Sequence, residues 1–216
     1  MMPPSPPRLF VIMAKSAHVA VIVKRGPARW AQLVLWDTRR DVFTAGAWIR
    51  GRIYAEKCDL SPDGQLFVYA AFQGQRLGTS YSDSYTAVSR PPWLHALALW
   101  PMHTTYGGGG RFSDNRRLTV RGVGPAHPVA AAHPDHPPSG LEVVSGATEH
   151  HRSSGEVPEA EWSGRDQSGR LVFAMRGGLF ARTDGTDAEL ASFTTQRPAP
   201  CPPPEWATRP LSGTSS

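Results

Sequence analysis

The histidines of this chain are its first candidates for metal ligands. His127, His133 and His136 lie within one short Pro-rich segment, and imidazole is a ligand that suits zinc, copper or nickel. A protein metal site also needs a rigid frame and second-shell hydrogen bonds, which a Pro/Ala-rich loop does not supply. The main interpretation is therefore no metal and no cofactor, and a metal-dependent enzyme or sensor using these three histidines stays open as an alternative.

The chain carries no recognisable signature of a catalytic nucleophile. It has no Gly-x-Ser-x-Gly motif, and Cys58, which could be paired on paper with His95 or His103, lies in an apolar stretch typical of a small core residue. The four glycines at 107–110 are not followed by the Gly-Lys-Ser/Thr of a phosphate-binding loop, which favours a flexible turn or a close backbone approach. We therefore predict no catalytic residue and favour a protein that is not an enzyme.

Arginine and aromatic residues are the stronger candidates for binding. Residues 48–54 alternate so that Trp48, Arg50, Arg52 and Tyr54 would share one face of a strand. A second set surrounds the glycine run, and both residue types are enriched at binding hot spots, although they also serve in cores and as solvent-facing cover. The candidate binding residues are Arg50, Arg52, Tyr54, Arg90, Trp93, Trp100, His103, Tyr106 and Arg111.

Composition limits the class of protein and of partner. The 216 residues are 40% hydrophobic and 19% charged, which is typical of a globular domain, and the two cysteines do not form a disulfide framework. The net charge of +5 comes almost wholly from arginine, which keeps nucleic acid or another polyanion open as a partner, although the codon bias of a GC-rich genome would give the same excess. The sequence shows neither a signal-peptide pattern nor an apolar run of about 20 residues, so we expect a cytoplasmic protein without membrane contact.

The pattern of apolar residues predicts many short strands. Runs rich in Val and Ile at residues 9–13 and 18–23 predict a hairpin that turns near Lys15 and Ser16. Residues 90–101 fit either a short helix, because Pro and Ala/Leu favour one, or a strand, which we prefer. Further strands are expected at residues 30–36, 42–44, 48–54, 65–72, 118–121, 141–144, 171–175 and 179–182, with Gly46 separating the second from the third.

A unit of turn followed by strand recurs three times, at residues 61–70, 113–122 and 166–175. Their sequences are SPDGQLFVYA, SDNRRLTVRG and DQSGRLVFAM, and each places an Asp among small polar residues before a Leu and an apolar strand. Their spacing of roughly fifty residues is near the period of repeat architectures with one small sheet per repeat. Such a unit cannot bury its sheet face alone and must stack on its neighbours.

The order of Trp36-Asp37, then Ser61-Pro62-Asp63-Gly64, then an apolar strand resembles a blade of the WD40 and TolB-like β-propeller families. The resemblance implies an all-β fold, a propeller-like stack of three to four short antiparallel sheets that is small, irregular or incomplete. The chain departs from the WD40 pattern in having one Trp-Asp and no Gly-His pair, and three or four units are few for a closed ring, so self-association could complete the stack. The segments CDLSPDG, RPPWLHALALWP and GGGG also resemble a bacterial protein family from which no function carries over.

We therefore predict one domain with two flexible ends. Residues 1–7 form a disordered N-terminus, residues 8–195 a propeller-like β domain with a Pro/His-rich insertion at 122–140, and residues 196–216 a disordered Pro-rich tail. The predicted function is that of a non-enzymatic binding module, with another protein as the expected partner.

Overall fold

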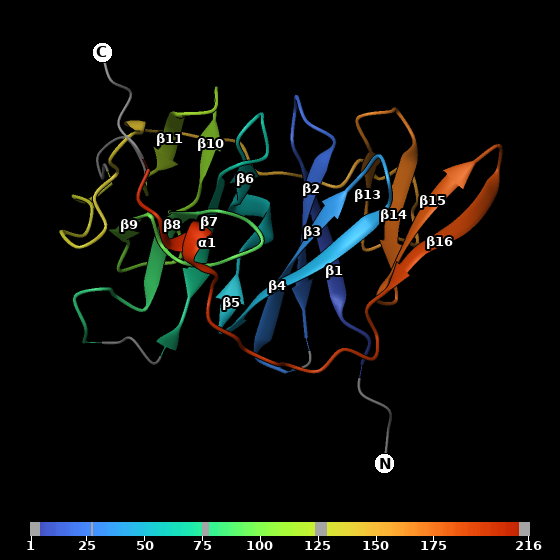
Figure 1. The fold of residues 1–216 in the computed structure, drawn as a ribbon, viewed down its shortest axis with the longest axis horizontal. Coiled ribbons are helices and arrows are strands. Elements are labelled where there is room, and N and C mark those ends of the chain that lie inside the picture. The colour runs from blue at the N-terminus through green and yellow to red at the C-terminus, as the bar shows by residue number, and fades with distance from the viewer. Residues whose placement is uncertain (1–4, 27, 75–77, 124–128, 212–216) are drawn as a thin grey trace.

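The structure, a computed structural model, describes residues 5–26, 28–74, 78–123 and 129–211 and is built almost wholly of strands in four short sheets (Figure 1). This confirms the predicted all-β fold. The first sheet is an antiparallel meander of β1 (Arg8–Met13), β2 (Val19–Arg25), β3 (Trp30–Asp37) and β4 (Val42–Arg50). Its first two strands are the predicted hairpin.

The other three sheets follow in chain order. The second sheet contains β5 (Arg52–Ile53), β7 (Phe67–Phe72), β8 (Ser84–Ser89) and β9 (Ala98–Pro101), with β6 (Asp59–Leu60) also paired to β7 and a 3-10 turn, η1 (Ala55–Lys57), before it. The third sheet contains β10 (Gly110–Phe112), β11 (Arg117–Arg121) and β12 (Glu142–Gly146). The fourth is a meander of β13 (Trp162–Arg165), β14 (Leu171–Met175), β15 (Gly178–Thr183) and β16 (Thr186–Ser192), and one short helix, α1 (Glu205–Thr208), lies near the C-terminus.

Three local expectations differ from the structure. Residues 42–50 form the single strand β4, and the chain breaks at Gly51 rather than at Gly46. Residues 90–97 form turns and irregular backbone around a cis Pro91-Pro92 bond, so only β9 of the predicted strand is present. The third sheet is mixed, not antiparallel, because β12 runs parallel to β11 after a long connection.

The sheets stack face to face in an order that differs from the chain order. One apolar core packs the first sheet against the second and includes Val21, Leu33 and Tyr69. A second core lies between the first and fourth sheets, and a third between the second and third sheets. The spatial order is therefore fourth, first, second, third, and the third and fourth sheets lie at opposite ends of an open stack (Figure 1).

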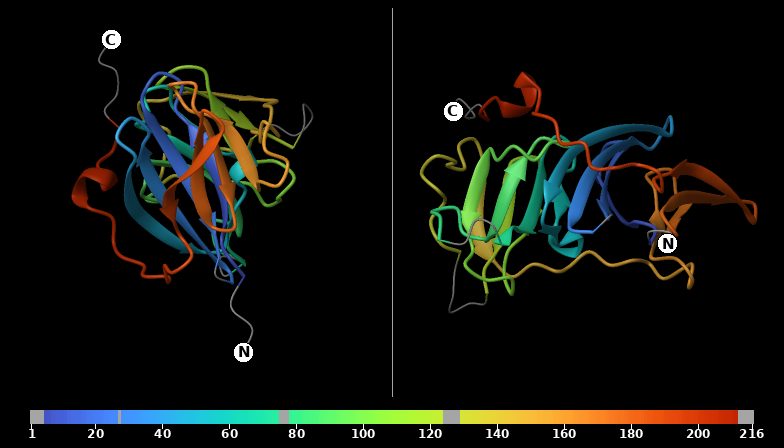
Figure 2. Two further views of the ribbon diagram at one scale, coloured as in Figure 1. Left: turned by 90° about the vertical axis from the view of Figure 1, so that its right-hand side faces the viewer. Right: turned by 90° about the horizontal axis from the view of Figure 1, so that it is seen from below.

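Two long segments run along the stack on opposite sides (right panel of Figure 2). Residues 147–161 return from the third sheet to the fourth, and residues 193–211 run from the fourth sheet back toward the second and third. The tail predicted to be disordered is placed as far as Leu211, which is buried together with Ala207. The described part of the Pro/His-rich insertion, residues 129–140, lies beside β9, because the amide of His133 donates to the carbonyl of Leu99 and that of Leu99 to His136.

Each sheet contains a turn held by an aspartate that accepts hydrogen bonds from backbone amides just ahead of it. Asp37 accepts from Arg39 and Arg40, Asp63 from Gln65, Asp114 from Arg116 and Arg117, and Asp166 from Ser168 and Arg170. These are Asx-type turns, in which the side chain replaces a backbone acceptor. Three of the four are the repeat units found in the sequence, and the fourth follows Trp36.

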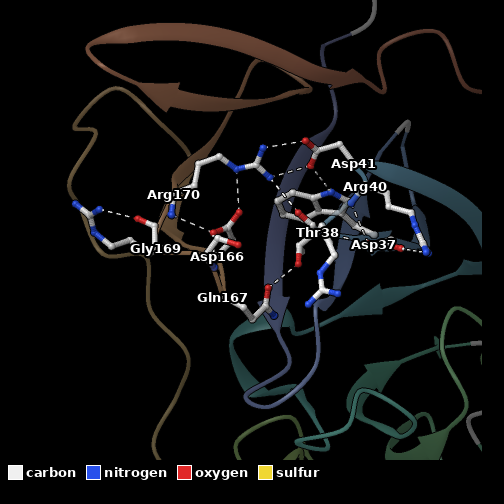
Figure 3. A network of polar contacts seen from close by, with 12 residues as sticks. Asp37, Thr38, Arg40, Asp41, Asp166, Gln167, Gly169 and Arg170 are labelled. Atoms are coloured by element: carbon white, nitrogen blue, oxygen red, sulfur yellow. Dashed lines mark hydrogen bonds and ion pairs between the residues drawn. The ribbon is translucent and has the colours of Figure 1, made fainter.

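A network of polar contacts joins the first sheet to the fourth (Figure 3). The guanidinium of Arg170, after β13, donates to both carboxylate oxygens of Asp41, at the β3–β4 turn, and to Asp166. Asp41 also accepts from the indole N–H of the fully buried Trp36. Beside it, Thr38 donates to the side chain of Gln167 over 2.7 Å. The residues of the Trp-Asp turn therefore hold two sheets together.

Candidate functional site

Five arginines meet at the end of the first sheet where the chain enters. In an antiparallel meander, the start of each odd strand lies beside the end of each even strand. Arg8 opens β1 and pairs with Arg25 at the end of β2, and Arg50, at the end of β4, pairs with Trp30 at the start of β3. The topology therefore brings these side chains from distant parts of the sequence to one end of the first sheet.

Arg29 and Arg52 complete this group, which we call the arginine groove. Arg29 lies in the β2–β3 turn, where its carbonyl accepts from the amide of Gly51, and Arg52 opens β5 directly after β4. The groove has a volume of about 1040 Å³. Its lining also includes Trp30 and Phe72, and none of its described lining residues is acidic.

The charge of the groove is not neutralised within the described part of the chain. All five arginines are exposed, and no described carboxylate forms an ion pair with any of them. Partial burial lowers the pKa of Arg25, and the nearby positive charges of Arg52 and Arg8 lower it further, whereas Glu56 acts in the opposite direction. Like charges held together without counter-ions favour an anionic ligand.

Two of the predicted binding residues, Arg50 and Arg52, line this groove. Tyr54 is not among the lining residues, and its ring lies 4.7 Å from the guanidinium carbon of Arg52 and 5.1 Å from Nζ of Lys57. Sequence reasoning missed Arg8, Arg25 and Arg29. The signal available was that Arg8 directly precedes, and Arg25 closely follows, the two apolar runs of the predicted hairpin at residues 9–13 and 18–23.

The other predicted binding residues have separate roles. Trp100 is 3% exposed and packs in the core between the second and third sheets. It therefore has the core role that the sequence left open as the alternative to binding. Arg111 donates to the carbonyls of Cys58, Gly110 and Glu56. Arg90 donates to the carbonyls of Arg209 and Pro210 and so holds the tail. Trp93 is half-buried, and His103 and Tyr106 are exposed.

The glycine run is a place of close packing. Gly109 lies so near η1 that an added Cβ would stand 2.1 Å from the carbonyl oxygen of Lys57. Nζ of Lys57 in turn donates to the carbonyls of Thr105 and Gly107, over 2.6 and 3.0 Å. The expectation of a close backbone approach is therefore confirmed.

The histidines do not form a metal centre in the part of the chain that the structure describes. His127 lies outside the described residues. His133 stacks on Tyr81 at 4.2 Å and its Nδ1 accepts from the amide of Asp135, so its Nε2 carries the proton toward Ser80. His136 lies 5.9 Å from His133, centroid to centroid. Among the described residues, no three His, Cys, Asp or Glu side chains are placed to hold one ion.

A separate Asp–His pair lies where the returning segment, residues 147–161, meets β6. Nε2 of His151, in the returning segment, is 2.9 Å from Oδ1 of the buried Asp59, and the other carboxylate oxygen accepts from the amide of Phe112. The neighbouring Cys58 is fully buried, which raises the pKa of its thiol far above its usual range. Cys58 is thus a core residue, and the pair ties residues 147–161 to β6.

In comparisons with known proteins, no family model, no curated protein and no solved structure matches the chain. The comparisons therefore identify neither a WD40 nor a TolB-like family, and the resemblance stays a prediction. No helix within the described residues is long and apolar enough to cross a membrane.

Proposed function

We propose that this protein is a non-enzymatic binding module and that its arginine groove binds a phosphate-bearing polyanion, with single-stranded nucleic acid as the ligand class. The observation that carries the proposal is that Arg8, Arg25, Arg29, Arg50 and Arg52 line one groove at the strand ends of the first sheet and have no acidic partner among the described residues. Clusters of this kind raise the local concentration of anions and bind them through released counter-ions.

The residue types favour phosphate over other anions. The planar guanidinium donates two parallel hydrogen bonds to a phosphate, a geometry that the ammonium of lysine cannot supply. All five cations of the groove are arginines, although Lys24 lies next to Arg25 on the opposite, buried side of β2. Every cation that lines the groove is therefore a forked donor.

The aromatic residues of the groove favour a single strand with accessible bases. Trp30 and Phe72 lie among the arginines, and Trp30 is held edge-on by Trp48 at a centroid distance of 6.4 Å. Aromatic rings beside a basic track can stack on bases, which contributes about 1–3 kcal/mol per base. A duplex, whose bases are already stacked, would use only the charges.

Fluorescence anisotropy of a labelled single-stranded oligonucleotide over a range of salt concentrations tests the proposal. We expect binding to weaken with salt, and the slope of log K against log salt to fall by about 0.7 for each arginine removed. The test variant is Arg25→Gln with Arg50→Gln. The matched control is Arg39→Gln with Arg116→Gln, which removes the same charge from exposed sites outside the groove lining.

Equal loss of affinity in the two double variants would mean that only net charge matters, and the groove would not be the site. Tighter binding of a poly-glutamate peptide than of the oligonucleotide would replace nucleic acid by an acidic protein segment as the ligand. Salt-insensitive binding would contradict the proposal altogether.

A further inference from the structure

The Pro-rich part of the tail offers a second interaction surface, independent of the arginine groove. Residues 197–203 read Arg-Pro-Ala-Pro-Cys-Pro-Pro, so a cation is followed by prolines at the third and sixth positions after it. Proline fixes φ near −65° and lacks an N–H, so such a stretch adopts the polyproline II conformation. Pro204, directly after it, has φ −67° and ψ 158°, which are typical values.

Both ends of this stretch are anchored to the body of the protein. Before it, Phe193 is 2% exposed and its amide donates to Gly177, and the side chain of Gln196 accepts from Nζ of Lys24 over 2.9 Å. After it, Ala207 and Leu211 are buried. The segment between them, residues 197–204, which we call the strap, runs along the outside of the stack (Figures 1 and 2).

On two of its three edges the strap exposes most of its residues. A polyproline II helix has about three residues per turn, so residues three apart share an edge. On one edge Arg197 and Pro200 are exposed and Pro203 is half-buried, and on the next Ala199 and Pro202 are exposed. On the third edge Pro198 and Pro204 are half-buried, and Cys201 between them is exposed.

We propose that the strap is a docking site for a protein domain of the SH3 type. Such domains bind polyproline II ligands in aromatic-lined grooves that receive the prolines, and a cation at one end of the ligand fits an acidic pocket beside the groove. Four of the five residues on the two edges that such a domain reads are exposed. The edge that it does not read is half-buried at Pro198 and Pro204.

Anchoring gives the strap an advantage over a free peptide. A ligand already held in its bound conformation loses less conformational entropy on binding. The shape of the strap is fixed by five prolines and by buried residues at both ends. The whole protein is therefore expected to bind at least as tightly as a peptide of the same sequence.

Isothermal titration of the full chain with a purified SH3 domain specific for Arg-x-x-Pro-x-x-Pro ligands tests this inference. We expect one-to-one binding that falls at least about tenfold in Arg197→Glu and in Pro200→Ala with Pro203→Ala. The control variants Cys201→Ala, at an unread position, and Pro210→Ala, outside the motif, should bind as the unmodified chain does. Circular dichroism of each variant verifies that the fold is retained.

Three outcomes would overturn the proposal. Binding of a synthetic peptide of residues 195–205 without binding of the full chain would mean that the fold masks the strap. Absence of binding by both, or equal affinity of Arg197→Glu and the unmodified chain, would mean that the strap is not such a ligand. Nucleic acid does not enter this experiment, so its result and that of the groove experiment are independent.

Discussion

Arg170 donates two hydrogen bonds, both of 2.8 Å, to the two carboxylate oxygens of Asp41, which precedes it by 129 residues. The side chains are 25% and 30% exposed, so this bidentate pair is partly shielded from water. Arg170 also donates to Asp166 in its own turn. One guanidinium therefore links the fourth sheet, which comes last in the sequence, to the first.

Replacing Arg170 by leucine should destabilise the protein by about 2 kcal/mol, because the half-buried carboxylate of Asp41 and the buried carboxylate of Asp166 lose their partner. Urea unfolding at neutral pH measures the change. The matched control is Arg165→Leu in the same hairpin, whose exposed pair with Glu156 should contribute less than about 1 kcal/mol. Equal losses in the two variants would mean that Arg170 acts as an ordinary surface charge.

The same pair predicts an acid dependence. The hydrogen bonds from Arg170 lower the pKa of Asp41 below its ordinary value of about 3.9. A carboxyl with a depressed folded-state pKa contributes stability above its unfolded pKa, and this stability is lost as the pH falls through the lower folded value. Unfolding free energies measured from pH 5 downward should fall more steeply for the unmodified protein than for Arg170→Leu, and parallel curves would contradict the assignment.

The arginine groove should cost the fold some stability. Besides burial, which lowers the pKa of Arg25 most, the charges of Arg52 and Arg8 lower it and so repel Arg25 in the folded state, and Glu56 offsets part of this repulsion. Arg25→Gln is therefore expected to raise the stability by about 0.5 kcal/mol at low salt, and the gain should vanish at about 1 M salt, where the Debye length is about 3 Å. Thermal unfolding at the two salt concentrations measures this, with Arg39→Gln as the control. A variant less stable than the parent at both salts would show that Arg25 stabilises the groove.

How far the sequence predicts this molecule depends on the range of the interactions involved. The strands, the β1–β2 hairpin and the Asp-containing turns follow from local alternation and turn chemistry, and the structure contains them. The face-to-face stacking follows from units that cannot bury a sheet face alone. The position of the fourth sheet beside the first does not follow, because Arg170–Asp41 and the apolar core there join residues that are distant in sequence.

The candidate site shows the same limit. Arg50 and Arg52 were found because they alternate along one stretch, but Arg8 and Arg25 join them only through strand register. Trp100 carries the same residue-type signal as Trp30 and yet is core, because burial depends on which sheets pack together. Residue types thus predict what a site could bind, and the topology decides which residues meet.

Lys24 predicts that stability rises in mild alkali. Its side chain is fully buried beside Gln196 and Trp48, and burial lowers its pKa to about 8. The unfolded chain, with a pKa near 10.4, binds more protons between about pH 8 and 10, so stability increases with pH across that window, by at most about 3 kcal/mol. Urea unfolding across this range should show the rise in the parent and in the control Lys15→Met, but not in Lys24→Met. A rise of equal size in Lys24→Met would assign it to another group.

Gly109 and Gly169 form a matched pair for testing the glycine run. Both have a positive φ, +77° and +80°, so alanine at either position carries the same backbone strain of about 1 kcal/mol. An added Cβ meets nothing within 4 Å at Gly169 but stands 2.1 Å from the carbonyl oxygen of Lys57 at Gly109. Since η1 must move to accept it, Gly109→Ala should destabilise the protein by more than about 3 kcal/mol.

Chemical unfolding of the two alanine variants measures the difference directly. The gap between them isolates the cost of the collision, because the conformational term is common to both. Displacing η1 also disturbs the hydrogen bonds from Lys57 to the carbonyls of Thr105 and Gly107, so amide exchange in the neighbouring turn should accelerate in Gly109→Ala alone. Equal destabilisation of the two variants would mean that the run is a flexible turn whose backbone can move aside.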